Sequence, residues 1–343
     1  MISRTDLDHV LDHSRDLWED LRGARLFITG GTGFFGGWLL ESLLHANQEL
    51  DLKVNASVLT RDPDAVNRSR PHLMLNPVLT LLKGDVRNFE FPHSEYSHII
   101  HAATEASARK NEEDPILMLD TILEGTRHTL DFAVQCKAEK FLFTSSGAVY
   151  GKQPSDLTHI PEDYNGGPDP MDARSAYGIG KKTAEHLCTL YARQYGFQAT
   201  IARCFAFVGP YLPLDIHFAI GNFIRDGLKG RTIIIQGDGT PYRSYLYAAD
   251  LAIWLWTILL RGESLRPYNV GSDEEMTIEQ VARNVAEQFD PSPEVQVMRE
   301  RVPGKPPERY VPSITRARRE LGLEAWIPIK EGITRTILFE KQG

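Results

Sequence analysis

Five short runs of apolar and β-branched residues alternate with helical stretches up to residue 205. The runs are RLFIT (25–29), VNASVL (54–59), HIIHA (98–102), KFLFTSS (140–146) and TIARCF (200–205). Strands that alternate with helices are typical of βαβ units, in which parallel strands form one buried sheet. The sequence therefore predicts an α/β fold of the Rossmann type, with a doubly wound parallel sheet.

The last third of the chain has a different pattern. Loops lengthen and prolines become more frequent after about Gly209, and Thr277 and Gln280 have the spacing of a capping box. We expect the run YNVG at Tyr268 to return to the main sheet. The predicted units are a dinucleotide-binding domain at 25–208 plus about 244–271 and a smaller α/β substrate-binding domain at about 209–243 plus 272–343. A helical leader at 1–24 is expected to pack on the sheet edge.

The composition argues against several classes of protein. A net charge of -8 provides no basic field for nucleic acid. The amino terminus lacks an apolar signal core, and the run LAIWLWTILL after Asp250 is too short to span a bilayer. Cys136, Cys188 and Cys204 are widely spaced and fit reduced core thiols better than a disulfide or a zinc site. We expect a cytoplasmic protein without a metal, a membrane partner or a nucleic-acid partner.

The stretch TGGTGFFGGW (29–38) places glycines where a buried strand passes into a helix. Gly30, Gly33 and Gly36 match a dinucleotide fingerprint with one extra residue in the first gap. The first glycine permits a tight turn, the second lets the backbone approach a pyrophosphate, and the third lets helix and strand pack closely. The other residues of this turn that we assign to the cofactor are Thr32, Phe34 and Phe35.

The end of the second run bears on the choice between NAD and NADP. Thr60 stands where an NAD site typically has an acidic residue, and Arg61 follows, which favours NADP because arginine accommodates a 2'-phosphate. Asp62 is also within reach of a ribose, and a solvated surface role for Arg61 is almost equally consistent with the pattern. Asp85 and Val86 of GDVR are placed to touch adenine, although GDV also occurs as a turn before a helix.

A candidate catalytic group follows in the middle of the chain. Tyr177 and Lys181 of YGIGK are four residues apart and therefore share one face of a helix. A lysine cation and a nicotinamide cation would lower the pKa of the phenol, so that it can exchange a proton with a sugar hydroxyl during hydride transfer. Ser145 and Ser146 end the run KFLFTSS and add hydroxyls at the edge where open α/β sheets bind ligands.

Together, these motifs resemble the extended short-chain dehydrogenase/reductases, specifically the nucleotide-sugar epimerase/dehydratase group. The resemblance runs from about Arg25 to Ile337. It rests on TGGTGFFG, GDVR, HAATEAS, SSGAVYG, YGIGK, RCFAFVGP, PYRSYLYAADLA and YNVGS. It implies that Tyr177 is the acid/base, that Lys181 holds the nicotinamide ribose and that Ser146 bonds the reacting sugar oxygen.

The resemblance also implies further contacts and partners. Cofactor-lining positions are Ala102, Ala103 and Thr144, and Arg203 serves structure. A nucleotide-diphosphate sugar is the implied substrate, and a homodimer through the helix with Tyr177 and the helix around 121–134 is the implied assembly. Guanidinium groups fit phosphate in a bidentate fork. The residues assigned to the substrate are Glu105, Ser145, Ser146, Asn222, Arg243 and Arg309.

The chain departs from the group at the residues that follow Ser146. Sugar 4,6-dehydratases of the group carry an acidic pair there, whereas this chain has Gly147 and Ala148, so dehydration would need Glu105 or another carboxylate. The main hypothesis is therefore epimerisation through a 4-keto intermediate. The alternatives are an NADPH-dependent reductase of a 4-keto sugar, a dehydratase, and an NAD(P)-sensing binding protein, against which the intact YxxxK argues.

Overall fold

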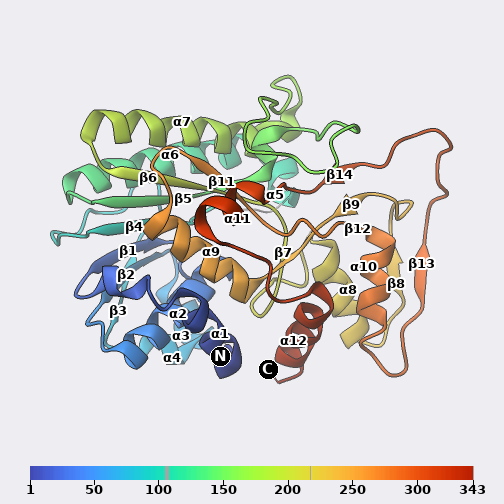
Figure 1. Cartoon of the computed structure of the whole chain (residues 1–343), viewed down its shortest axis with the longest axis horizontal. Coiled ribbons are helices and arrows are strands. Elements are labelled where there is room, and N and C mark those ends of the chain that lie inside the picture. The colour runs from blue at the N-terminus through green and yellow to red at the C-terminus, as the bar shows by residue number, and fades with distance from the viewer. Residues whose placement is uncertain (105–107, 217, 343) are drawn as a thin grey trace.

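A parallel seven-stranded sheet forms the centre of the molecule (Figure 1). The computed structural model describes residues 1–104, 108–216 and 218–342. The strand order is β11-β6-β5-β4-β1-β2-β3. The strands are β1 (Arg25–Thr29), β2 (Asn55–Thr60), β3 (Leu79–Lys83), β4 (His98–His101), β5 (Lys140–Ser146), β6 (Gln198–Cys204) and β11 (Pro267–Val270). All five predicted runs are strands and YNVG joins the sheet as β11, which confirms these predictions, whereas β3 was missed.

The strand order reverses between β1 and β4. From this point β2 and β3 extend to one side, and β5, β6 and β11 extend to the other. Open α/β sheets bind ligands outside the carboxyl ends of the strands at such a reversal. The backbone N–H of Ala102 donates to the Thr29 carbonyl over 3.1 Å, so the two chain segments that leave β1 and β4 run side by side. The predicted Rossmann-type, doubly wound sheet is confirmed.

Helices cover both faces of this sheet (Figure 1). One face is covered by α2 (Phe34–Leu50) and α9 (Ala248–Arg261), and the other by α6 (Pro115–Gln135) and α7 (Ala176–Tyr195). The run after Asp250 lies within α9, whose residues are buried from Ala248 to Leu260, as predicted. In the described part of the chain, no helix is long and apolar enough to cross a membrane. The remaining elements of this region are α3 (Pro63–Ser69), α4 (Pro71–Met74), α5 (Ala108–Glu113), and the short 3-10 helices η2 (Gly147–Tyr150) and η3 (Ala173–Ser175).

The leader consists of α1 (Arg4–Ser14) and the 3-10 helix η1 (Trp18–Leu21). It packs on α9 and α2, and so forms an outer layer over one face of the sheet instead of covering a sheet edge as expected. The Tyr247 hydroxyl donates to Asp6 over 3.0 Å, and His9 Nε2 lies 2.8 Å from Asp250 Oδ1. An amphipathic helix needs an apolar partner for its buried stripe, which the helical layer supplies.

A smaller α/β part lies beside the main sheet, at the right of Figure 1. It contains two small sheets, in which β8 pairs with β13 and β9 lies between β12 and β14. The capping box of Thr277 and Gln280 opens α10, as predicted. We keep the domain boundaries near residues 209, 244 and 272 as a proposal. The elements of this part are α8 (Ala219–Leu228), β8 (Ile233–Ile235), β9 (Tyr242–Arg243), β12 (Met276–Thr277), α10 (Ile278–Ala286), β13 (Val295–Val297), β14 (Arg309–Tyr310) and α12 (Ile329–Gln342). Between this part and the main sheet, β7 (Phe207–Val208) pairs with β10 (Leu246–Tyr247), and α11 (Thr315–Leu321) packs on β11 and α9.

Candidate functional site

The glycine turn between β1 and α2 fits a dinucleotide. Gly30 has a φ of +72°, and a Cβ there would lie 2.5 Å from the Ala102 carbonyl carbon. A Cβ on Gly36 would lie 2.2 Å from Gly31 Cα, so helix and strand can only pack this closely without side chains. Gly33 is the N-cap of α2, and no side chain of the described residues bonds to this cap. Uncapped N–H groups at a helix start attract a phosphate.

Three aromatic or hydroxyl side chains of this turn stay partly accessible, namely Thr32, Phe34 and Phe35. The Phe35 ring packs edge-on against Phe207, with ring centroids 5.1 Å apart. The turn therefore contacts β7, the short strand that follows β6 where the chain leaves the main sheet.

The acidic residues on the adenosine side are already engaged. Asp62 caps α3, where its carboxylate accepts a backbone N–H over 3.0 Å. Asp85 accepts from Arg87 Nε over 2.9 Å, and this bond, with a smaller contribution from Arg61, holds the pKa of Asp85 below its ordinary value. Val86 is buried beside α6. Asp85 is thus held in place by arginine, and its contact with adenine stays a prediction.

A buried histidine fixes the chain after β4. His101 Nδ1 lies 2.8 Å from Thr29 Oγ1, and the Ala103 N–H donates to the same hydroxyl over 3.1 Å. Burial, with the charge of Lys181, lowers the pKa of His101 to about 3, so the imidazole is neutral at neutral pH. These bonds hold Ala102 and Ala103 against the glycine turn, where the sequence predicts that they line the cofactor.

The predicted catalytic residues meet at the carboxyl end of β5. The Ser146 side chain lies close enough to the Tyr177 hydroxyl to oppose part of the rise in its pKa. One turn along α7, Lys181 Nζ donates to the Thr144 carbonyl over 2.7 Å and to Thr104 Oγ1 over 2.6 Å. A phenol, an alcohol and an amine therefore converge beside the glycine turn. Such a group can hold a substrate hydroxyl and accept its proton.

Burial shifts the pKa values of both α7 residues. It raises the pKa of Tyr177 above its ordinary value, and the interaction with Ser146 only partly opposes this shift. It lowers the pKa of Lys181 to about 8. Loss of water therefore outweighs the interaction with Ser146, and the lowering expected beside a nicotinamide cation stays a prediction. A bound oxidised nicotinamide would supply hydride acceptance and a positive ring charge that favours the phenolate.

A carboxylate one turn further along α7 was missed by the sequence reasoning. Glu185 accepts from Ser145 Oγ over 2.5 Å and from Arg203 Nη2 over 2.7 Å. Arg203 also donates to the Tyr150 hydroxyl over 2.9 Å, so it serves structure as predicted. Ser145 was assigned to the substrate, but its hydroxyl is turned into this buried network. Extending the four-residue spacing from Tyr177 through Lys181 would have pointed to Glu185.

Tyr310 is a second phenol that the sequence reasoning missed. Its hydroxyl lies close enough to the Ser146 side chain to interact with it, and burial raises its pKa to about 12. A Cβ on Gly147 would lie 2.7 Å from both the Tyr310 hydroxyl and the Phe205 ring. These two aromatic residues therefore fill the space at position 147, where dehydratases of the resembled group carry an acidic residue.

A family model matches more than half of this chain. The family model described as the NAD dependent epimerase/dehydratase family matches residues 26–271. The chain belongs to this family. The resemblance drawn from the motifs is confirmed, and with it the assignment to an NAD-dependent enzyme of this type.

Other members of the epimerase/dehydratase family share most of this chain's length. UDP-glucuronic acid decarboxylase 5 of Arabidopsis thaliana is 33% identical over 310 residues, which are 90% of this chain and 87% of that protein. The structure of Thermus thermophilus UDP-glucose 4-epimerase with NAD is 27% identical, has a TM-score of 0.75, and covers 92% of this chain and 99% of that one. The dTDP-glucose 4,6-dehydratase of Streptomyces venezuelae is 23% identical with a TM-score of 0.77 and coverages of 93% and 97%, which shows the shared fold.

The two arginines assigned to the substrate in this family member point in different directions. Parallel pairing of β14 with β9 places Tyr310 opposite Arg243 and Arg309 opposite Tyr242. Because side chains alternate along a strand, Arg243 and Tyr310 share one face, and Arg309 lies on the other. Arg309 binds Glu275, and its guanidinium lies 4.1 Å from the Tyr242 ring centroid. The structure thus turns Arg309 away from the Ser146 cluster.

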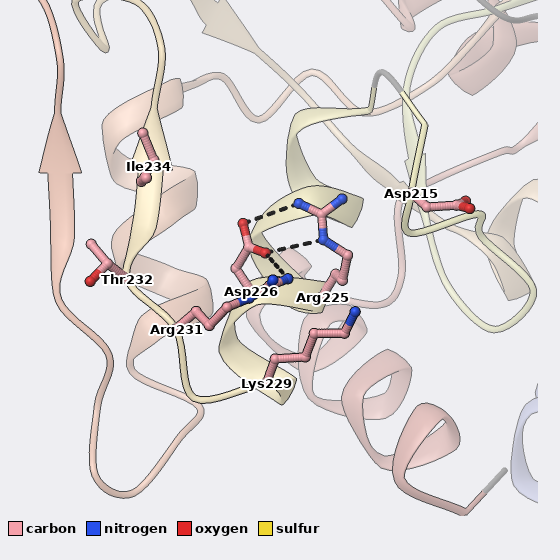
Figure 2. Close-up of a pocket in the computed structure, with 7 residues that line it drawn as sticks. All are labelled: Asp215, Arg225, Asp226, Lys229, Arg231, Thr232 and Ile234. Atoms are coloured by element: carbon pink, nitrogen blue, oxygen red, sulfur yellow. Dashed lines mark hydrogen bonds and ion pairs between the residues drawn. The ribbon is translucent and has the colours of Figure 1, made fainter.

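Asn222 lies in the first turn of α8, and later residues of this helix line an open pocket of about 570 Å³, which Figure 2 shows. Its side-chain oxygen accepts from Arg225 Nη1 over 3.0 Å. Arg225 and Arg231 both bind Asp226, over 3.1 and 2.8 Å, so much of the positive charge is neutralised within the pocket. The lining residues are Asp215, Arg225, Asp226, Lys229, Arg231, Thr232 and Ile234. Glu105, also assigned to the substrate, lies outside the described residues.

Proposed function

We propose that this chain epimerises a nucleotide-activated sugar at C4, through oxidation to a 4-keto intermediate and return of the hydride to the opposite face. The observation that carries the proposal is the convergence of Ser146, Tyr177 and Lys181 beside the glycine turn, with no carboxylate at positions 147 and 148. The names of the relatives, which include a UDP-glucose 4-epimerase and UDP-glucuronic acid decarboxylases, support a nucleotide sugar as the substrate class.

Each residue has a distinct role in this proposal. Tyr177, as phenolate, takes the proton of the C4 hydroxyl, while hydride leaves C4 for the nicotinamide and a C4 ketone forms. Ser146 holds the reacting oxygen by a hydrogen bond, and the Lys181 ammonium favours the phenolate. When the hydride is returned, Tyr177 gives its proton back to the same oxygen, after the 4-keto sugar has rotated to present its opposite face. The cycle is redox-neutral, so the cofactor is regenerated in place.

Arg243 is the proposed ligand for the diphosphate of the substrate. It lies on the same face of the β9–β14 pair as Tyr310, which contacts Ser146. A guanidinium fork suits a diphosphate, and the pairing sets it beside the reacting centre. Asn222 is proposed as a further contact to the substrate. For the cofactor, the family supports NAD, and NADP is the alternative that Arg61 favours.

Decarboxylation of a nucleotide-linked uronic acid is the second candidate. The 33% identity with a UDP-glucuronic acid decarboxylase over 90% of the chain favours it. It would use the same first step, because a C4 ketone makes the C6 carboxylate a β-keto acid that loses carbon dioxide without a further acidic residue. The two candidates therefore differ in the substrate rather than in the Ser146–Tyr177–Lys181 cluster.

The first experiment denatures the purified protein and identifies released nucleotides by mass spectrometry. The protein is then incubated with UDP-glucose or UDP-glucuronic acid and followed by proton NMR. Retained NAD or NADP and conversion of UDP-glucose to its C4 epimer support the proposal, and Tyr177→Phe should abolish turnover while cofactor stays bound. Formation of a pentose product with carbon dioxide from UDP-glucuronic acid favours the second candidate. Stoichiometric consumption of added NADPH would instead identify a reductase.

We also propose a homodimer through α6 and α7. Ile116 and Leu117 on α6 and Leu190 on α7 are exposed apolar side chains of the helical layer on this side of the sheet. A partner subunit packed on this helical layer would remove such apolar side chains from water. Light scattering on the wild type and on Leu190→Glu tests this, and a monomeric wild type would refute it.

A further inference from the structure

A buried arginine lies against the glycine turn from the side of α3. Arg70 is 9% exposed, and its Nη1 and Nη2 atoms lie 3.4 and 3.5 Å from the Gly33 carbonyl oxygen. Gly37 leaves room for it, because a Cβ there would lie 2.6 Å from Arg70 Nη1. The guanidinium therefore sits at the first turn of α2, whose N–H groups face the cofactor site.

This position is electrostatically unfavourable for a cation in the absence of an anion. The start of a helix carries partial positive charge, and α2 has neither an acidic residue in its first turn nor a side-chain cap from the described residues. Burial lowers the pKa of Arg70, while Tyr211 and Glu41 oppose that shift. The guanidinium nevertheless stays charged, as arginine does throughout the accessible pH range. A negative phosphate at the same helix start would offset this cost.

A rigid cluster holds the guanidinium in place. Arg70 Cζ lies 3.9 Å from the Tyr211 ring centroid, and the Tyr211 hydroxyl is hydrogen-bonded to Glu41. Glu41 also accepts the Ile2 N–H over 2.9 Å and lies 3.0 Å from His72 Nε2. Tyr211 has a φ of +71°, a conformation that costs energy for a side chain of this size and persists because its surroundings enforce it. The cluster thus fixes Arg70 with its nitrogens toward Gly33.

We propose that Arg70 is a positioning residue for a phosphate of the dinucleotide cofactor. It orients the first turn of α2 through the Gly33 carbonyl and adds positive charge beside the N–H groups that meet the phosphate. The inference rests on the NAD dependence of the family and not on the proposed epimerisation, so either can fail without the other. The phosphate is the pyrophosphate shared by NAD and NADP or the 2'-phosphate found in NADP alone.

The test measures dinucleotide affinity on protein freed of bound nucleotides. Isothermal titration with NADH and NADPH is compared for the wild type, Arg70→Met, which removes the charge, and Arg70→Lys, which keeps it. Arg70→Met should weaken binding about tenfold, as expected for one charge near a helix start, and Arg70→Lys should recover most of the loss. The matched control is Arg68→Met in the last turn of α3, which Arg70 directly follows. The Arg68 side chain is 71% exposed, and its substitution should leave both affinities unchanged.

The outcomes distinguish three roles for Arg70: positioning the pyrophosphate, positioning the 2'-phosphate, and only stabilising the fold. Equal weakening of NADH and NADPH supports the pyrophosphate, and weakening of NADPH alone supports the 2'-phosphate. Unchanged affinities with a lowered melting temperature would show that Arg70 only stabilises the fold and would overturn the proposal. If Arg70→Met does not fold, Arg70→Gln gives the same comparison, since it keeps an N–H donor for Gly33 without the charge. Affinity for UDP, measured in parallel, should not change in any variant.

Discussion

Tyr310 lies directly opposite Arg243 in the parallel pairing of β14 with β9. This single register brings a phenol from the last part of the chain to the Ser146 hydroxyl at the end of β5, and sets an arginine beside it. The guanidinium carbon of Arg243 lies 5.9 Å from the Tyr310 ring centroid. The smaller part of the molecule therefore contributes directly to the surroundings of Ser146, and the arginine that we propose for the diphosphate lies on the same pair of short strands.

Substitution of Gly147 tests this packing. Gly147→Ala places a Cβ 2.7 Å from both the Tyr310 hydroxyl and the Phe205 ring, and overpacking of this kind costs about 1–3 kcal/mol of unfolding free energy. Urea denaturation should show this loss. The control is Gly237→Ala, where the new Cβ meets no atom of the described residues within 4 Å and stability should change by less than about 0.5 kcal/mol. Equal stabilities of the two variants would contradict the placement of Tyr310 over Gly147.

Substitution of Glu185 should destabilise the protein strongly. Glu185→Gln leaves the mostly buried Arg203 without its charged partner, and breaking a buried ion pair in this way costs about 3–5 kcal/mol. A guanidinium chloride unfolding curve measures the loss. Glu287→Gln removes an exposed partner of Lys330, 3.0 Å away, and should cost no more than about 1 kcal/mol. A small effect at Glu185 would mean that Arg203 finds water in place of the carboxylate.

The pKa of Lys181 predicts how stability changes with pH. Its pKa is about 8 in the folded protein and has an ordinary value of 10.5. Below about pH 8 the lysine is protonated in both states, and the folded protein bears the cost of burying the charge. Between the two pKa values the unfolded chain binds more protons, so stability rises with pH. Unfolding free energies from about pH 7.5 to 9.5, below the ordinary range of tyrosine, should show this rise.

Lys181→Met serves as the comparison for that pH series. It has no titrating group at this position, so its stability should rise less steeply with pH than that of the wild type. Parallel curves for the two proteins would show that another group causes the rise. Lys182→Met, on the neighbouring and exposed position of α7, is the matched control and should keep the wild-type slope.

The three cysteines should be unreactive in the folded protein. All are free and buried, and burial raises the pKa of Cys136 and Cys188 and raises that of Cys204 to about 12. Because the thiolate is the reactive form, a disulfide reagent at neutral pH should label the native protein very slowly and the unfolded protein at all three positions. Rapid labelling of one thiol without unfolding would show an opening that the structure does not contain.

Local patterns predicted much of the fold and part of the site. Five strands, the buried helix after Asp250 and the capping box at Thr277 follow from short-range spacing, whereas the convergence of Tyr177 with Ser146 was predicted from the order of the family's motifs. Arg309 and Tyr310 are neighbours in the sequence, and alternation requires that they face opposite ways without saying which faces Ser146. The register in which β14 pairs with β9 decides that Tyr310, and not Arg309, faces Ser146. The position of Arg70 beside Gly33 could not be predicted from the sequence for a similar reason, because it depends on how Tyr211 packs against the guanidinium.

The contacts of the leader also set an order of events during synthesis. Asp6 leaves the ribosome early, yet its partners Tyr247 and Arg335 follow 241 and 329 residues later. At a translation rate of about 5–20 residues per second, the leader waits roughly 15–65 s for Arg335. The leader can pack on α2 as soon as that helix has been made, but its bonds to Tyr247 and Arg335 form only after those residues have been synthesised. Docking of the first helix is therefore completed in stages, and its contact with α12 is the latest of them.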